Sequence, residues 1–358
     1  MLSTESELGK HIRAERDALA EAITARHYEL HPELATRYGQ LGRGKCLQDA
    51  QYHLSYLAEA LSSSSPALFA DYVSWAKVML STRGIPAADL TQNLQCMREV
   101  LERELPDDIS PSVCKFIDAG LNRLPEFPDE LPTLIDDGPH RELAENYLAL
   151  LLRGERHVAA RLVLDSVDGG VNPKDVYLHV FQRTQREIGR LWQMNKISVA
   201  HEHYFTAATQ FIMAQLYPRI FRTERAGRTM VATSVSGELH ELGLRMVTDF
   251  FEMEGWDTYY LGANTPAASV VQAVVERKAQ VLGISATMTF HLRAVEELIT
   301  LARKTAGAGD TKIIVGGYTF NLEPGLWRQL GADLYAADAQ QAVYLVNSSV
   351  PDASDDEC

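Results

Sequence analysis

One histidine of this sequence stands where a side chain is able to bind a metal ion. His240 lies in the segment Thr233-Ser-Val-Ser-Gly-Glu238-Leu-His240-Glu-Leu-Gly243, between a predicted strand over residues 229–233 and an amphipathic helix from about 239 to 254. Ligands of open parallel sheets bind at the carboxyl ends of the strands. Neutral imidazole is a common metal ligand, and a carboxylate such as Glu238 fixes its tautomer by accepting the other ring N–H. The segment therefore predicts a metal-binding histidine, with an ordinary surface histidine as the alternative.

The same acid-x-His-x-x-Gly pattern resembles the cobalamin-binding domains of corrinoid proteins. In that family the histidine replaces the cofactor's own base as the lower ligand of cobalt. The resemblance implies this role for His240, with Glu238 orienting it, although many members have aspartate at that position. It also implies that Leu239, Glu241 and Gly243 contact the cofactor.

Two later segments extend the resemblance. Ser285 ends a predicted strand over residues 281–285 and is followed by Thr287, while the pair Gly316-Gly317 follows a predicted strand over 312–315. In the corrinoid family these positions line the slot that receives the nucleotide tail of the cofactor. Glycines let the backbone approach a bulky ligand, and a serine hydroxyl hydrogen-bonds a ring nitrogen. An ordinary turn is the alternative for the glycine pair.

A further motif precedes these segments, in a predicted helical bundle over residues 140–222. Trp192 is followed, after nine residues, by Glu202-His203. This spacing resembles the cobalamin-dependent photoreceptor regulators, in which the tryptophan packs on the adenosyl group above cobalt. The resemblance implies that Trp192, Glu202 and His203, with the adjacent His201, surround the upper ligand. A core indole and a polar helix start, capped by Ser198, are the alternative.

The sequence departs from the photoreceptor pattern in two ways. Gln193 stands where that family often has a histidine that captures cobalt after illumination. His203 or His201 is therefore expected to take that role, or water fills the vacated site. The family's DNA-binding helix-turn-helix domain is also absent, and an acidic helical domain stands in its place.

Composition and charge argue against several other classes of function. The chain has 358 residues and a formal net charge of −14, which argues against direct nucleic-acid binding. Arg219, Arg222, Arg225 and Arg228 form only a weak cluster, interpreted as a solvated helix end and linker. No apolar run is long enough to span a bilayer and no signal peptide precedes the domains, so a cytoplasmic location is expected. The four cysteines show no metal-type spacing, and no disulfide framework is expected.

The apolar periodicity predicts a multidomain protein. Residues 1–124 are expected to form an all-helical domain of five or six helices, with patterns over 8–30, 46–61, 69–80 and 90–105 and a short helix ending at 124. This domain resembles, in fold, the helical sensor modules of stress-response regulators. His53 could ligate a haem in a globin-like bundle, but a hydrogen-bonded core histidine is the favoured interpretation.

The rest of the chain divides at composition changes. Residues 125–139 carry four prolines and predict a linker. A four-helix cap bundle is expected over 140–222, with helices 142–153, 155–167, 173–193 and 199–221. Strand and helix then alternate over 223–350, and five such units predict an α/β doubly wound parallel five-stranded sheet, the cobalamin-binding Rossmann-like fold. Residues 351–358 are expected to be disordered.

These features lead to one main functional prediction and two alternatives. The main prediction is a cobalamin-binding, light-responsive sensor that is not an enzyme. It is expected to signal through oligomer change or a protein partner such as a transcription regulator or signalling protein. It would hold adenosylcobalamin, with methylcobalamin as the second choice, and form a homo-oligomer through the N-terminal output or dimerisation domain. A corrinoid methyl-carrier protein of a methyltransferase system is the first alternative. A mutase cobalamin subunit is the second, disfavoured because mutases need a separate substrate barrel.

Overall fold

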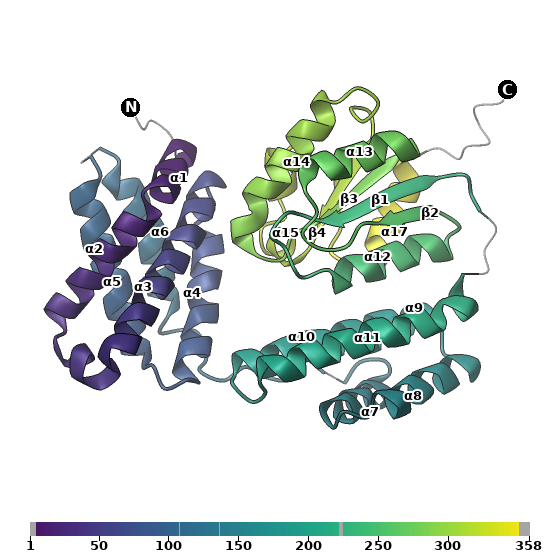
Figure 1. Cartoon of the computed structure of the whole chain (residues 1–358), viewed down its shortest axis with the longest axis horizontal. Coiled ribbons are helices and arrows are strands. Elements are labelled where there is room, and N and C mark those ends of the chain that lie inside the picture. Colours follow the sequence, from purple (N-terminus) through teal and green to yellow (C-terminus); the bar gives the residue numbers. More distant parts are fainter. Residues whose placement is uncertain (1–4, 107, 136, 222–224, 351–358) are drawn as a thin grey trace. The chain divides into compact units, whose positions relative to one another are not determined.

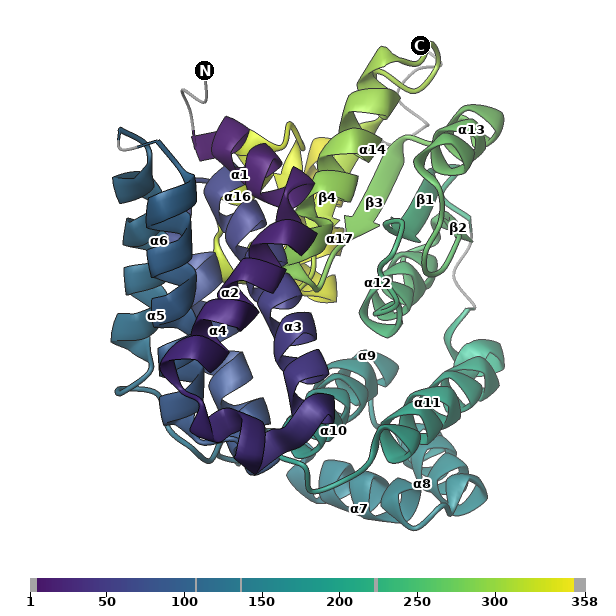
Figure 2. The ribbon, with the colours of Figure 1, turned by 60° about the vertical axis from the view of Figure 1, so that its left-hand side comes forward.

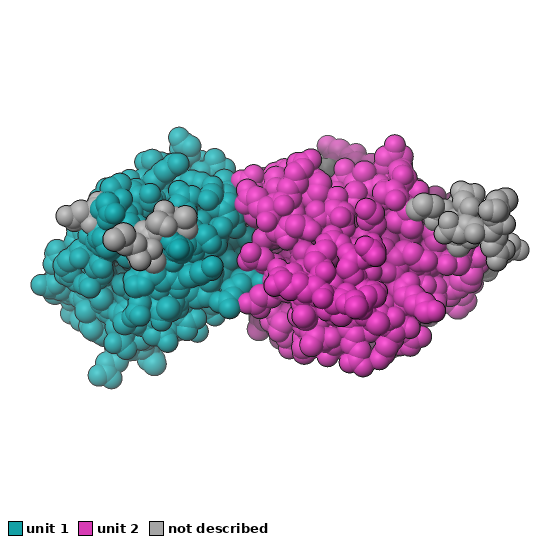
Figure 3. Space-filling model, turned by 90° about the horizontal axis from the view of Figure 1, so that it is seen from above, with its two compact units in different colours: residues 1–130, 288–293 teal, residues 131–287, 294–358 magenta. Residues whose placement is uncertain are grey.

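The computed structural model describes residues 5–106, 108–135, 137–221 and 225–350. It divides into two compact units, coloured separately in Figure 3. The first unit comprises Met1–Glu130 with Met288–Arg293, and the second comprises Leu131–Thr287 with Ala294–Cys358. The predicted tail, 351–358, lies outside the described residues.

The first unit is all helical, as expected (Figures 1 and 2). Its long helices are α1 (Glu5–Ala14), α2 (Arg16–Leu30), α3 (Glu33–Ser62), α4 (Pro66–Ser81), α5 (Ala87–Glu104) and α6 (Ser110–Arg123). Two boundaries differ from the predicted ones. The pattern over 8–30 is broken between α1 and α2 at Glu15, and α3 begins well before residue 46 because it continues through a kink at Gly39, where φ is 62°.

The core of this unit accounts for His53. His53 is 2% exposed, and its Nδ1 lies 2.7 Å from the hydroxyl of Tyr72. Tyr72 in turn stacks on Tyr56 with ring centroids 3.7 Å apart. Burial lowers the pKa of His53 to about 4, so the ring is neutral at physiological pH. His53 is therefore a hydrogen-bonded core histidine, which was the favoured interpretation.

The second unit begins with the cap, a bundle of antiparallel helices. Its elements are α7 (Arg141–Leu152), α8 (Arg156–Asp168), α9 (Pro173–Asp175), the π-helix η1 (Val176–Phe181), α10 (Gln182–Gln193) and α11 (Val199–Ile220). The predicted helix over 173–193 is thus one continuous run that contains a π-helical stretch. Such wide turns are rare and often occur at functional sites.

The cap is followed by a five-stranded, fully parallel sheet with the order β2-β1-β3-β4-β5. The strands are β1 (Thr229–Ser234), β2 (Asp257–Tyr260), β3 (Val281–Ser285), β4 (Lys312–Gly316) and β5 (Leu334–Tyr335). The connecting helices are α12 (Leu242–Met253), α13 (Ala267–Arg277), α14 (Leu292–Lys304), α15 (Tyr318–Leu322), α16 (Leu326–Gln329) and α17 (Ala339–Ser349). In Figure 1, α12 and α17 lie on one face of the sheet and α13 and α14 on the other. The predicted doubly wound fold is confirmed.

One boundary in this sheet matters for the site. Helix α12 begins at Leu242 rather than near residue 239. Residues Leu239 and His240 therefore lie in the loop that follows β1. This loop contains Gly237, whose φ of 85° is readily adopted only by glycine.

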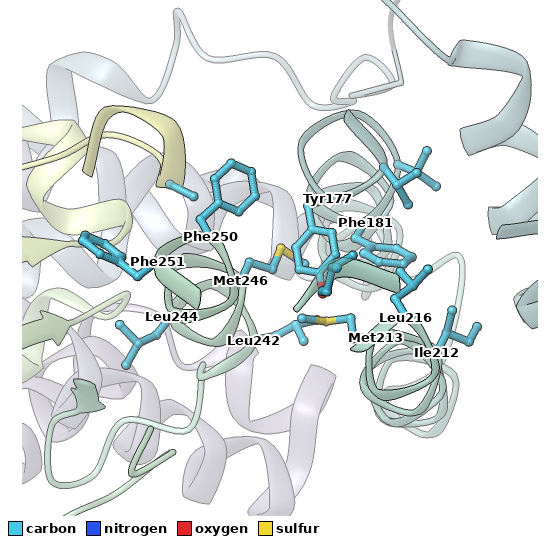
Figure 4. Packing of buried hydrophobic residues seen from close by; sticks show 14 of the residues in the cluster. Tyr177, Phe181, Ile212, Met213, Leu216, Leu242, Leu244, Met246, Phe250 and Phe251 are labelled. Atoms are coloured by element: carbon cyan, nitrogen blue, oxygen red, sulfur yellow. The ribbon is translucent and has the colours of Figure 1, made fainter. Parts of the chain in front are cut away.

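A single apolar core joins the cap to the α/β domain within the second unit. Figure 4 shows Tyr177 of the cap beside Met246 of α12, and Met213 of the cap beside Leu242 of α12. The cap therefore rests on the helix that directly follows the predicted cobalt ligand.

The weak arginine cluster is largely occupied by contacts inside the protein. Arg219 pairs with a carboxylate of α8 and Arg225 with a carboxylate of α12. Arg228 is buried, with its guanidinium 4.5 Å from the centroid of an indole ring. Arg222 lies outside the described residues. The three described arginines thus form no free basic face.

Two further expectations concern the chain as a whole. Cys46, Cys96 and Cys114 are free thiols, and Cys358 lies outside the described residues. Within the part of the chain that the structure describes, no helix is long and apolar enough to cross a membrane. Buried Cys114 has its pKa raised to about 11, so this thiol is a poor nucleophile.

Candidate cofactor site

The predicted cobalt ligand is held by a buried carboxylate. Glu238 is fully buried, and its Oε1 lies 2.6 Å from Nδ1 of His240 and accepts the backbone N–H of His240 at 3.0 Å. Its Oε2 accepts the backbone N–H of Thr287 at 2.8 Å, which ties the β1 and β3 loops together. The His240 side chain itself is 60% exposed. This arrangement fixes the Nδ1–H tautomer and leaves Nε2 as the nitrogen that can bind a metal.

The carboxylates around His240 also set its proton affinity. The hydrogen bond that His240 donates to Glu238 raises the pKa of His240 above the ordinary value, and the charges of Glu238 and Glu202 raise it further, while partial burial opposes the shift. Metal binding requires the neutral imidazole. Protons therefore compete with a metal for His240 at a higher pH than for an ordinary histidine.

The loop that carries His240 is fixed by a neighbouring loop that the sequence did not reveal. Asn264, with a left-handed φ of 52°, accepts the N–H of Gly237 at 2.8 Å and donates its own N–H to the carbonyl of Glu238 at 3.0 Å. Glu241 accepts the N–H of Ala263 at 2.9 Å. No local motif marks Asn264, because its role appears only when the loops after β1 and β2 come together.

The residues predicted to line the nucleotide slot lie together at the carboxyl edge of the sheet. Ser234, Ser285 and Gly316 are in register on adjacent strands. Ser285 is buried, while Thr287 is half-buried beside Glu238. The structure thus brings the predicted slot residues and the His240 loop to one edge.

The two slot glycines also have close backbone neighbours inside the protein, while their predicted role beside the nucleotide tail stays a prediction. A Cβ on Gly317 would lie 2.3 Å from the carbonyl oxygen of Ala286, and its φ is 105°. A Cβ on Gly316 would lie 3.1 Å from the carbonyl oxygen of Ala336. Neighbouring backbone thus requires glycine at position 317 and leaves little room for a side chain at position 316. Gly243 is different, because no atom lies within 4 Å of the position of its missing Cβ.

Large apolar side chains are exposed on the elements that carry these residues. Leu239, next to His240, is 73% exposed, and Tyr318, next to Gly317, is 53% exposed. Val199, at the start of cap helix α11, is 51% exposed. These side chains fit a large, mostly apolar ring such as a corrin better than they fit a small polar ligand. The donor set and its surroundings therefore suit cobalamin.

On the cap, the predicted upper-face residues form a polar cluster at the start of α11. Glu202 Oε2 lies 2.5 Å from His203 Nδ1, and Glu202 Oε1 accepts the hydroxyl of Thr206 at 2.9 Å. The Ser198 hydroxyl lies 2.8 Å from Nδ1 of His201. Ser198 occupies the N-cap position, but its side chain makes no capping bond to the backbone, contrary to expectation.

Two adjacent residues at the end of α10 differ in burial. Trp192 is half-buried, whereas Gln193 is only 7% exposed. The Gln193 side chain thus lies within the protein. Its chemistry already made it a poor cobalt ligand, and its burial agrees with that view.

A buried carboxylate joins the cap to the far end of α12. Asp249 accepts the Tyr177 hydroxyl at 2.8 Å and the Tyr217 hydroxyl at 3.3 Å, while Arg245 donates to the Tyr217 oxygen at 3.0 Å. Burial raises the pKa of Asp249 to about 6, although these hydroxyls and Arg245 oppose the shift. A cavity of about 290 Å³ borders Asp249 and Arg245.

This raised pKa predicts how stability depends on pH. Since the folded protein binds the Asp249 proton more tightly than the unfolded chain does, the carboxyl favours folding at low pH and loses that contribution as pH rises from about 4 to about 6. Relative to Asp249→Asn, the wild-type chain should lose roughly 2 kcal/mol of unfolding free energy over this window. Urea denaturation of both proteins at several pH values measures it. A difference that does not change with pH would refute the assignment.

Comparison with known proteins identifies the domains that carry these features. Residues 228–344 match a B12 binding domain model, and residues 143–217 match a second B12 binding domain model. Dimethylamine corrinoid protein 1 of Methanosarcina mazei is 26% identical over 178 residues, covering 48% of this chain and 80% of that protein. Trimethylamine corrinoid protein 1 of the same organism is 23% identical over 198 residues, covering 54% of this chain and 90% of that protein.

A solved structure supports the fold. The monomethylamine corrinoid protein of Methanosarcina barkeri superposes with a TM-score of 0.53 and 18% identity, covering 59% of this chain and all of that chain. The cap and the α/β domain therefore form a corrinoid-binding fold, and the domain matches support the prediction that the ligand is a cobalamin.

The comparisons overturn the main functional prediction. The similar proteins are named as methylamine corrinoid proteins, so the expected light-responsive photoreceptor and transcription-regulating sensor is wrong. The expected transcription-regulator or signalling partner is wrong with it. The Trp192 and Glu202-His203 spacing misled because it reflects two antiparallel cap helices joined by a short turn, which a carrier protein also needs. The preference for adenosylcobalamin depended on the same resemblance and loses its basis.

Proposed function

We propose that this protein is the cobalamin-carrying component of a methyl-transfer system, methylated and demethylated by separate enzymes. The proposal is supported by the similarity to dimethylamine and trimethylamine corrinoid proteins. The observation that carries it is the buried Glu238 carboxylate 2.6 Å from His240 Nδ1 at the carboxyl edge of a parallel sheet. When bound, cobalamin supplies a cobalt centre that accepts a methyl group from one partner and releases it to another. The chain itself acts as a carrier rather than as a catalyst.

In this proposal each part of the site has a separate task. His240 would hold cobalt through Nε2, and Glu238 fixes the tautomer and the direction of the imidazole. The corrin rests against three residues around the His240 loop, namely Leu239, Glu241 and Gly243. The nucleotide tail occupies the slot beside Ser285, Thr287, Gly316 and Gly317. The methyl form of the cofactor fits this role, because a carrier needs an upper ligand that partners can exchange.

The cap residues shield the upper side of the cofactor between transfers. Trp192 supplies a flat apolar wall, and Glu202 with His203 and His201 supplies a polar rim. Water exclusion by such a cap protects a reactive centre from side reactions. The expected partners are therefore methyltransferase proteins that must reach this upper face. Homo-oligomer formation through the N-terminal helical domain stays a prediction from the sequence.

A methylation assay tests the proposed function. The purified full chain is loaded with hydroxocobalamin, reduced with titanium(III) citrate and mixed with radiolabelled mono-, di- or trimethylamine and a purified methyltransferase for that amine. We expect label on the protein-bound cofactor with at least one of the three amines. A chain that binds cobalamin but accepts label from none of them would contradict the proposal.

A further inference from the structure

The cap rests on α12 through an apolar contact. Tyr177 of η1 lies beside Met246 of α12, and Met213 of α11 lies beside Leu242 of α12 (Figure 4). Burial of apolar surface is favourable but non-directional. Polar contacts between the cap and α12 add directional constraints on the orientation of the cap.

Several polar contacts lie at the C-terminal end of α12. Asp249, which is 4% exposed, accepts the hydroxyls of Tyr177 at 2.8 Å and Tyr217 at 3.3 Å. Lys174 of the cap also pairs with Glu254, the residue that follows α12. Hydrogen bonds to a buried charged group are among the stronger ones in proteins. This end of α12 is therefore tightly joined to the cap.

A different contact lies at the other end, beside the proposed cobalt ligand. The side-chain amide of Gln210, on α11, donates to Oε1 of Glu241 at 2.9 Å. The Oε2 of Glu241 accepts the backbone N–H of Ala263 at 2.9 Å. Glu241 directly follows His240, so one carboxylate joins the cap, the β2–α13 loop and the ligand loop. Both Gln210 and Glu241 are only half-buried.

The two ends of α12 are unequal in strength and well separated. Glu241 and Asp249 are about 12 Å apart along the helix axis. The apolar contact of Leu242 and a partly solvated hydrogen bond hold the first end, whereas hydrogen bonds to a buried carboxylate and an ion pair hold the second. A force on the cap therefore breaks the Gln210 contact first, and the cap turns about the Asp249 end. This turn would lift the start of α11, which carries Glu202.

We propose that Asp249 is the pivot of the cap and that the Gln210–Glu241 hydrogen bond is the latch that sets its closed position. Glu241 is then a positioning residue, because it acts on the cap through Gln210. The inference depends on the proposed function only for its purpose, since a carrier must uncover the upper face of its cofactor. The latch itself is a property of the chain without cofactor.

Exchanging donor and acceptor across the latch tests the proposal. Gln210→Glu sets two carboxylates against each other and should open the latch. Combining it with Glu241→Gln restores a hydrogen bond, because the new amide donates to the new carboxylate and its oxygen still accepts the Ala263 N–H. The conservative Glu241→Gln alone should keep the latch closed, since one amide can donate to the other. Hydrogen–deuterium exchange of the full chain without cofactor reports the position of the cap.

We expect Gln210→Glu to raise amide exchange in residues 199–210 roughly tenfold, with residues 211–220 unchanged, and the double variant to return to within about twofold of wild type. Circular dichroism checks that each variant is folded. Wild-type exchange in Gln210→Glu, or failure of the double variant to restore it, would refute the latch. Equal exchange over 199–210 and 211–220 would refute the pivot. The assay uses no methyl donor, so its failure would leave the methyl-carrier proposal standing, and failure of the methylation assay would leave the latch standing.

Discussion

The His240→Ala variant should bind hydroxocobalamin at least about 100-fold more weakly than the wild-type chain. Changing a partner of a metal ligand typically costs 10- to 100-fold in affinity, and loss of the ligand itself should cost no less. Equilibrium dialysis with absorption spectroscopy measures the affinity and the lower ligand together. Cofactor that remains on the variant should show the spectrum of the base-on or water-ligated form.

Two further variants make this result specific. His157→Ala removes another exposed histidine of the second unit, on α8, and should leave the affinity unchanged. Glu238→Gln should reduce the affinity by roughly 10- to 100-fold, because a neutral amide orients the imidazole less firmly. In the wild-type chain, affinity should fall as pH drops through the raised pKa of His240, since its protonated form cannot bind cobalt. Unchanged affinity and an unchanged spectrum in His240→Ala would remove His240 from the site.

The candidate cobalt ligand, His240, was predictable because its motif is local. The acid, the histidine and the glycine occupy six consecutive positions after a strand, so strand ends and spacing alone place them at a ligand-binding edge. The five strands and most helices were predictable too, because their apolar periodicity can be recognised within short segments of the sequence. The start of α12 was predicted too early because residues 239–241 are held outside the helix by distant contacts, including that of Glu241 with Ala263.

The cap contacts could not be predicted because they join distant segments. Gln210 and Glu241 are 31 positions apart, and Tyr177 and Asp249 are 72 apart. No local pattern states which of many polar residues will meet across such distances. The function was missed for a related reason. The Trp192 and Glu202-His203 spacing constrains helix packing around an upper ligand. It does not determine whether the protein responds to loss of that ligand, as a sensor does, or passes the ligand to an enzyme, as a carrier does.

Two glycines of the site, Gly317 and Gly243, are expected to differ in role, because Gly317 is needed for folding and Gly243 is proposed to leave room for the corrin. Gly317→Ala should destabilise the full chain by roughly 2 to 4 kcal/mol, because alanine is strained at positive φ and overpacking of a rigid site adds to that cost. Its φ is 105°, and the new Cβ would lie 2.3 Å from the carbonyl oxygen of Ala286. That oxygen belongs to the backbone just after β3, so it cannot move aside without disturbing the strand end. Urea denaturation measures the loss.

Gly243→Ala is the matched control, and its effect should have the opposite sign. Gly243 lies in α12 with no atom within 4 Å of the new Cβ, so alanine should stabilise the protein without cofactor by about 0.5 to 1 kcal/mol through helix propensity. If Gly243 borders the corrin as proposed, the same methyl group should weaken hydroxocobalamin binding. A Gly317→Ala chain as stable as wild type would mean that Ala286 yields to the methyl group. A Gly243→Ala chain with full cobalamin affinity would place the corrin away from the start of α12, because a cofactor in contact there has no room for the added carbon.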